Sequence, residues 1–240
     1  MRTLVVLPTY NEIANIEKML RAIRAEVPSC DVLVVDDGSP DGTADAADRV
    51  REEMGQINVL RRSGKGGLGS AYRAGFSWGL ERGYDSFVEI DCDFSHDPRA
   101  LPDMLSLGEK YEVVIGSRYV PGGAIPSWST SRLLLSKGGN RYASLMLGLG
   151  VADSTAGYRV YSKSALEKID YQTVRADGYG FQIEMTYRAR SGGATIVEHP
   201  ISFTDRTEGE SKMSRAIVTE ALWMVTKWGV ARLFGRGPRR

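Results

Sequence analysis

The residues in this sequence best suited to chemistry are two aspartates one residue apart, Asp91 and Asp93. They end an apolar segment that predicts a strand over 85–91, and a polar turn follows over 94–98. Carboxylates at the carboxyl end of a buried strand lie where open α/β sheets bind ligands. Two hard oxygen donors suit Mg²⁺ or Mn²⁺, which usually bridges a few carboxylates to substrate phosphates. The pair therefore suggests a metal–diphosphate site, although solvated aspartates at strand ends are also common.

Two more polar clusters, residues 8–12 and 36–42, follow the first two predicted strands. In these clusters Tyr10 could stack on a base, and Glu12 or Asp37 could accept hydrogen bonds from a base or a ribose. Taken alone, the second cluster is equally well explained as a turn with a helix cap. Three acidic strand ends at one edge of a sheet favour a nucleotide site.

The elements that must position these residues alternate regularly in the first half of the chain. Strands are predicted over 3–8, 31–36, 56–61, 85–91 and 112–117, and helices over 12–26, 41–53, 67–83 and 99–109. Apolar strands that alternate with amphipathic helices predict an α/β fold with a mostly parallel central sheet and helices on both faces. Later elements are a loop over 120–131, a helix to about 149, a strand over 158–161, a helix near 181–191, strands near 194–204 and a last helix over 213–234.

Composition limits the class of protein. The 240 residues are 42% apolar and 25% charged, as expected of an ordinary globular protein with one large domain, with or without an appendage. A net charge of +1 argues against nucleic-acid binding. Two cysteines give no disulfide framework and no metal-ligand spacing, which favours a reducing compartment. No apolar run approaches the roughly 20 residues that span a bilayer, so we expect a soluble or peripheral protein.

One motif points elsewhere. Residues 64–69 match the dinucleotide fingerprint G-x-G-x-x-G. Asp91 lies about 20 residues beyond them, where this fingerprint requires an acidic residue. The motif follows the third predicted strand, however, and not the first. A nicotinamide-dependent oxidoreductase is therefore a distant alternative, and glycines that permit a tight turn and close helix packing are the better interpretation.

Several segments together resemble the inverting family 2 glycosyltransferases of GT-A fold. They are residues 6–12, 35–43, 91–96, 116–119, 155–159, 205–206 and 209–212. In combination they resemble specifically the catalytic subunits of dolichol-phosphate and polyprenol-phosphate mannosyltransferases, in order from about residue 3 to 215. The resemblance implies transfer of mannose from GDP-mannose to a polyprenyl or dolichyl phosphate with inversion, and a requirement for Mg²⁺ or Mn²⁺.

The resemblance also implies a role for each matching residue. The guanosine pocket would comprise Pro8, Tyr10, Glu12, Val35 and Asp37. Metal and diphosphate would be held by Asp91 and Asp93, by the backbone of Cys92, and by Ser95, where some relatives carry glutamine. Phosphate at the reaction centre would contact Arg118, and the donor diphosphate would be neutralised by Arg206 and Lys212.

A polyprenyl acceptor implies membrane contact. In the helical segment 129–149, leucines alternate with basic residues, and Arg132, Ser136 or Lys137 could reach a lipid phosphate. We expect a catalytic domain over 1–212, and an amphipathic helix with a basic tail over 213–240 that either anchors the protein or packs on the sheet. The expected location is peripheral, on the cytoplasmic side of a membrane. The sequence does not specify whether the protein requires an integral-membrane partner.

Two further alternatives keep the fold. The motifs do not specify base or hexose, so a donor such as UDP-glucose would also fit. A nucleotide-sugar-binding subunit without catalysis is disfavoured because Asp91, Asp93 and Arg118 are all present. The neighbouring His96 is a candidate base, but a turn or capping role is favoured, because an acceptor phosphate needs no proton removed.

Overall fold

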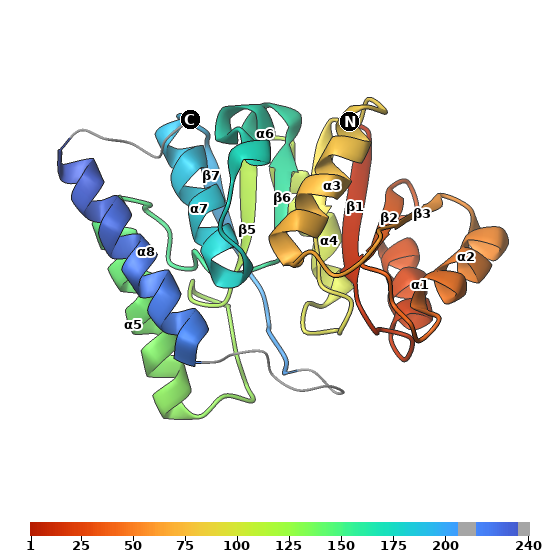
Figure 1. The fold of residues 1–240 in the computed structure, drawn as a ribbon, viewed down its shortest axis with the longest axis horizontal. Coiled ribbons are helices and arrows are strands. Elements are labelled where there is room, and N and C mark those ends of the chain that lie inside the picture. The colour runs from red at the N-terminus through yellow and green to blue at the C-terminus, as the bar shows by residue number, and fades with distance from the viewer. Residues whose placement is uncertain (206–214, 235–240) are drawn as a thin grey trace.

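Seven strands form one sheet in the order β3-β2-β1-β4-β6-β5-β7 (Figure 1). The computed structural model describes residues 1–205 and 215–234. The strands are β1 (Thr3–Thr9), β2 (Asp31–Asp36), β3 (Ile57–Arg61), β4 (Ser86–Glu89), β5 (Val113–Ser117), β6 (Arg159–Ser162) and β7 (Ile196–Pro200). Only β6 runs antiparallel to its neighbours in this sheet, and all other pairs are parallel. The predicted α/β class with a mostly parallel sheet is confirmed.

Helices cover both faces of the sheet. Residues of α1 (Ile16–Glu26), α2 (Thr43–Met54) and α4 (Leu101–Gly108) pack in one apolar core. Residues of α3 (Leu68–Leu80), α6 (Lys163–Ile169) and α7 (Gly178–Ser191) pack in the other. The central strands are apolar on both faces because both are covered, and residues 4–7 of β1 are completely buried.

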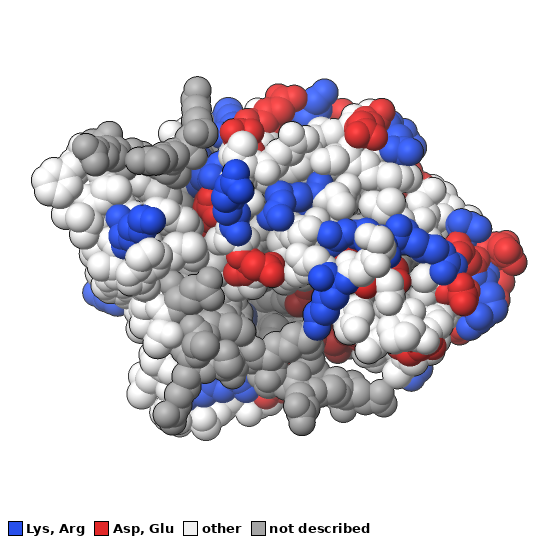
Figure 2. Space-filling view, in the orientation of Figure 1, with Lys and Arg blue, Asp and Glu red and all other residues white. Residues whose placement is uncertain are grey.

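Two long helices, α5 (Thr130–Leu147) and α8 (Arg215–Leu233), lie side by side beyond the β7 end of the sheet (Figure 1). Tyr142 and Thr226 form a hydrogen bond of 2.7 Å between their hydroxyls, and Gly229 packs closely against Met146. Within the described residues no helix is long and apolar enough to cross a membrane. Acidic and basic side chains gather over α1–α3, whereas the α5–α8 end is mostly uncharged on the visible face (Figure 2).

Exposed apolar side chains concentrate on these two helices. On the described surface the large ones there are Leu134, Leu135, Leu145, Leu222, Trp223, Val230 and Leu233, with Phe234 directly after α8. One side of α8 packs inward instead, since Val225 is buried in the core and Trp228 stacks on Tyr187. The last helix therefore both packs on the fold and exposes apolar surface.

The structure differs from the predicted elements in three places. Strand β4 ends at Glu89, so the turn that carries the aspartates begins earlier than predicted. Helix α6 and the 3-10 turn Tyr171–Thr173 were not predicted. The helix predicted over 99–109 begins as a 3-10 turn, Pro98–Ala100, where the Asp97 carboxylate accepts a hydrogen bond from the Arg99 N–H and proline occupies the first turn.

Close packing of α3 on the sheet leads to a stability prediction. A Cβ on Gly79 would lie 2.5 Å from Phe87 Cε1 and 2.7 Å from Leu4 Cδ2. Gly79→Ala should therefore lower the free energy of unfolding, measured by urea denaturation, by about 1–3 kcal/mol. Gly138→Ala on α5 is the control, because among the described residues a Cβ there meets nothing within 4 Å. It should raise the stability by roughly 0.5–1 kcal/mol, and equal losses in both variants would contradict the packing argument.

Candidate active site

A cleft of about 590 Å³ opens at the carboxyl ends of β1, β2 and β4. It brings together most of the site residues predicted from the sequence. These are Pro8, Tyr10, Glu12, Asp37, Asp91, Cys92, Asp93, Ser95, Arg118 and Arg132. The parallel strands explain this convergence, since their carboxyl ends meet at one edge of the sheet.

The turn after β4 directs both aspartates at this cleft. Asp93 is buried, and its Oδ1 accepts a hydrogen bond of 3.0 Å from the Ser95 N–H. The side chain of Asp91 is 27% exposed and faces the cleft more openly. Between Asp93 and Ser95, Phe94 adopts φ +58°, a left-handed conformation that is costly for a bulky residue and occurs most often at functional sites.

The donor atoms of this turn fit a hard divalent ion. Asp91 and Asp93 offer carboxylate oxygens, and the Ser95 side chain lies beside them at the cleft wall. Burial raises the pKa of the Cys92 thiol well above its ordinary value. No group of three or more His, Cys, Asp or Glu residues in the described part of the chain could hold a metal on its own. This arrangement suits an ion that ligand phosphates help to coordinate.

The second polar cluster holds the first loop in place. Asn11, at φ +59°, donates its N–H to Ser39 Oγ at 3.0 Å, and the Glu12 N–H bonds Thr43 Oγ1 at 2.9 Å. The carboxylate of Asp36 accepts from the Ser39 N–H at 2.9 Å and from the Thr9 hydroxyl at 3.0 Å. The turn interpretation is thus correct for Asp36, while its neighbour Asp37 lines the cleft.

The glycine-rich loop closes over the Asp37 side of the cleft. Arg62 Nη1 and the Gly66 N–H donate to the two oxygens of Asp37, at 2.5 and 2.9 Å. Lys65 Nζ lies 4.6 Å from the centre of the Tyr10 ring, a cation–π contact. Neither Arg62 nor Lys65 was predicted to belong to the site.

The far end of this loop contacts α7. The Gly69 N–H donates to Asp177 Oδ1 at 2.8 Å, and a Cβ on Gly69 would meet the Phe181 ring at 2.8 Å. The glycines therefore serve a tight turn and close helix packing, as the sequence favoured over a nicotinamide site. Asp177 lines the cleft and was not predicted, because its only signal is an acidic residue before a helix.

Arg118 lies at the opposite end of the cleft in a buried ion pair. Its Nε and Nη2 donate to the two carboxylate oxygens of Asp153, each at 2.7 Å, and Nη2 also donates to Thr155 Oγ1 at 2.8 Å. Burial opposes the charge on Asp153, but Arg118 outweighs it and lowers the pKa of that carboxyl. Nη1 makes no hydrogen bond to any described residue, and Arg118 lines the cleft.

His96 packs between rings. Its imidazole centre lies 5.2 Å from that of Tyr158 and 5.6 Å from that of Phe203, and the side chain is 3% exposed. Nδ1 lies 3.5 Å from the Asp91 backbone nitrogen and accepts a long hydrogen bond from it. These contacts agree with the expected turn-stabilising role.

Three predicted residues do not line this cleft, and two lie outside the described residues. The side chain of Val35 is fully buried in the core near Gly75, so it cannot line the cleft, because this end of β2 faces α3. Ser136 lines an apolar cavity that adjoins the cleft, where it accepts a 2.6 Å hydrogen bond from Tyr119. Lys137 is exposed, 5.7 Å from the centre of the Tyr119 ring. Arg206 and Lys212 lie outside the described residues.

Comparison with known proteins identifies the family. The model of the family described as "Glycosyl transferase family 2" matches residues 4–170, more than half of the chain. The chain belongs to this family. It is 52% identical over 231 residues to the undecaprenyl-phosphate mannosyltransferase of Micrococcus luteus, covering 96% of this chain and 95% of the relative. It is 47% identical over 231 residues to the polyprenol monophosphomannose synthase of Mycolicibacterium smegmatis, covering 95% and 87%. The resemblance seen in the sequence is confirmed, and the chain is a glycosyltransferase.

Solved structures of glycosyltransferases share the fold. One is glucosyl-3-phosphoglycerate synthase from Mycobacterium tuberculosis with Mn²⁺ and UDP-glucose, at a TM-score of 0.61 and 22% identity over 99% of this chain and 80% of that chain. Another is the mannosyltransferase PcManGT from Pyrobaculum calidifontis with GDP-Man and Mn²⁺, at a TM-score of 0.62 and 17% identity over 100% and 66%. At these identities the likeness supports the GT-A fold alone.

The buried ion pair gives a second prediction. Asp153→Asn removes the carboxylate that compensates the Arg118 charge, so the free energy of unfolding should fall by about 3–5 kcal/mol in urea denaturation. Asp205→Asn is the matched control, since Asp205 pairs with Arg132 at 3.3 Å but is 41% exposed. The control should lose no more than about 1 kcal/mol. A smaller loss for Asp153→Asn than for the control would contradict the assignment.

Proposed function

We propose that this glycosyltransferase transfers mannose from GDP-mannose to a polyprenyl phosphate with inversion at the anomeric carbon. One observation carries the proposal: the acidic cleft and an apolar cavity meet at shared residues. Arg118, Trp128, Thr155 and Tyr179 line both. An acceptor with a charged head and a hydrocarbon tail matches this junction, because its two parts need opposite surroundings.

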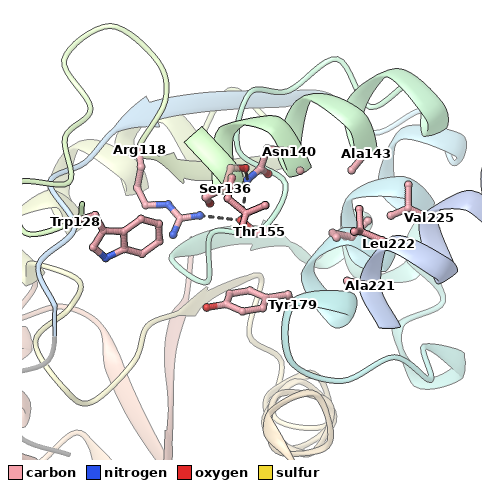
Figure 3. Close-up of a pocket in the computed structure, with 13 residues that line it drawn as sticks. Arg118, Trp128, Ser136, Asn140, Ala143, Thr155, Tyr179, Ala221, Leu222 and Val225 are labelled. Carbon is pink, nitrogen blue, oxygen red and sulfur yellow. Dashed lines mark hydrogen bonds between the residues drawn. The ribbon is translucent and has the colours of Figure 1, made fainter. Parts of the chain in front are cut away.

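The apolar cavity lies between α5, α7 and α8 and has a volume of about 90 Å³ (Figure 3). Its apolar lining comprises Leu135, Ala143, Ile183, Ala221, Leu222 and Val225. In Figure 3 the Arg118 guanidinium lies at one end, with Trp128 on one side and Thr155 on the other. A prenyl chain would enter along the helices, and its phosphate would stop at Arg118.

Basic residues around the junction would bind the acceptor phosphate. Arg118 offers Nη1, and guanidinium groups suit phosphate because their donors lie in one plane. Arg132 stacks on Trp128 at 3.9 Å and pairs with Asp205 at 3.3 Å, so phosphate would compete with that carboxylate. Ser136 could donate from the cavity wall, and Lys137 would add positive charge nearby.

The donor would occupy the other half of the cleft. Its base would stack on Tyr10, with Glu12 and Asp37 as acceptors for base or ribose donors. Pro8 and Cys92 would contribute the wall of this half of the cleft. Asp91, Asp93 and Ser95 would hold Mg²⁺ or Mn²⁺ against the diphosphate, and the ion would supply Lewis-acid stabilisation of the departing charge. We also assign Arg206 and Lys212 to that diphosphate, on sequence resemblance alone.

The transfer requires positioning more than proton removal. An acceptor phosphate has a second pKa near 6, so at neutral pH it is largely dianionic and nucleophilic. One of its oxygens would bond to the anomeric carbon as the bond from that carbon to the diphosphate oxygen breaks, which inverts the configuration. Arg118 and Arg132 would orient the attacking phosphate and reduce its repulsion from the diphosphate.

A transfer assay tests the function. Purified protein is incubated with labelled GDP-mannose, a short polyprenyl phosphate and Mg²⁺ or Mn²⁺, and label extracted into organic solvent is counted. Asp93→Ala should reduce the product at least about 100-fold, because it removes an electrostatic stabiliser of the reaction. Asp103→Ala is the control, since Asp103 is exposed on α4 and does not line the cleft. No lipid-linked label from GDP-mannose would refute the proposed donor, and transfer from UDP-glucose instead would assign a different one.

We also propose that the α5–α8 end lies on a membrane, at its cytoplasmic side. Trp223 and Leu233 are 65% and 80% exposed, and Lys227 Nζ lies 5.1 Å from the Trp223 ring centre. Aromatic and apolar side chains beside lysine are typical of an interfacial anchor.

Liposome flotation tests this placement. The double variant Trp223→Glu with Leu233→Glu should lower the fraction bound to anionic liposomes about tenfold or more, because each change removes apolar surface that the membrane would bury. Tyr111→Glu is the control, because Tyr111 is also exposed but follows α4, away from α5 and α8. Equal flotation of the double variant and the wild type would refute the placement.

A further inference from the structure

The wall of the cleft beside Asp91 contains a buried amide that no step described above uses. Gln182, in the second turn of α7, is 2% exposed and lines the cleft. Its Nε2 donates to Glu89 Oε2 at 2.8 Å. An amide nitrogen carries two hydrogens, so one of them remains after this bond.

Gln182 and Glu89 have more hydrogen-bonding capacity than the bond between them uses. Within the described chain, the Oε1 atoms of both Gln182 and Glu89 are buried without a hydrogen-bond partner. Buried polar atoms are nearly always bonded, and exceptions call for an explanation. The contacts that Arg159 and Thr186 make here do not involve this side chain, because both residues donate to the Gln182 backbone oxygen.

Gly157 leaves space in front of the amide. A Cβ at this position would lie 3.9 Å from Gln182 Nε2, 3.9 Å from Asp91 Oδ2 and 3.7 Å from His96 Cε1. All three residues, with Gly157, line the cleft. The space is thus close to both a hydrogen-bond donor and a carboxylate acceptor, which is the pairing that a hydroxyl group requires.

We propose that Gln182 is a specificity residue whose Nε2 donates a hydrogen bond to one hydroxyl of the donor hexose, while Glu89 fixes the orientation of the amide. The inference rests on the proposed function, because it places the transferred sugar between Asp91 and α7. The hydroxyl would accept from Nε2 and donate to Asp91 Oδ2. Glu89 is a positioning residue, since it acts only through Gln182.

Binding measurements separate this role from a structural one. With Mg²⁺ present, the affinities of wild type and Gln182→Met for GDP and for GDP-mannose are compared by calorimetry. Methionine keeps the volume and removes the donor, so the affinity for GDP-mannose should fall about tenfold while that for GDP, which has no hexose, is unchanged. Glu89→Gln retains an acceptor for Nε2 and should show at most a threefold loss, whereas Glu89→Met should approach the loss of Gln182→Met.

Deoxy analogues of GDP-mannose provide the second readout. If Gln182 bonds one hydroxyl, the difference between wild type and Gln182→Met should vanish for the analogue that lacks this hydroxyl and persist for the others. Unchanged GDP-mannose affinity, an equal loss for GDP, or an equal loss for every analogue would each overturn the inference. If Gln182→Met does not fold, Gln182→Asn, which withdraws the amide by one methylene, decides on the same measurements. Wild type that binds GDP-mannose but transfers no label would refute the proposed reaction and leave this binding test valid.

Discussion

The pair between Arg118 and Asp153 is the contact on which the architecture of the site depends. It joins the carboxyl end of β5 to the loop before β6 through three hydrogen bonds, including one from the Arg118 backbone N–H at 3.0 Å. Glu198 of β7 in turn accepts from the Asp153 N–H at 2.9 Å. Removing either partner of such a buried pair would leave an uncompensated buried charge and strongly destabilise the fold. The cleft and the apolar cavity therefore meet at a point that this pair holds in place.

The half of the cleft around Tyr10 and Asp37 is organised differently. There, short polar side chains fix the loops: Ser39 and Thr43 bind the backbone of residues 11–12, and Asp37 binds Arg62 and Gly66. These contacts are local to neighbouring strand ends, and they leave Tyr10 facing Lys65 across the pocket. Polar side chains thus fix the loops on one side of the site, whereas apolar side chains of helices line the cavity on the other.

The convergence of residues at the ends of β1, β2 and β4 could be predicted because its signals are local. Asp91, Asp93, Tyr10 and Asp37 each follow a β-branched run, and parallel strands bring such positions to one edge. Asp153 carries no comparable signal, since its importance comes from a partner 35 residues away. Val35 shows the limit of motif transfer, because a residue next to a binding motif can point into the core. Helix α6 was missed because it is only 7 residues long and begins directly after β6.

The direction of β6 was equally invisible in the sequence, and it has a consequence for how such a site can diversify. Because β6 runs against β4, with Arg159 opposite Glu89, its amino end lies at the edge where the parallel strands have their carboxyl ends. The segment that enters β6, from Asp153 to Gly157, thereby reaches the cleft from the opposite chain direction. Changes of length or composition in this entering segment would reshape the cleft wall between Asp91 and Arg118 while the loops that follow β1, β2 and β4 kept their course. A single reversed strand thus gives this wall a chain connection of its own, separate from the loops after the parallel strands.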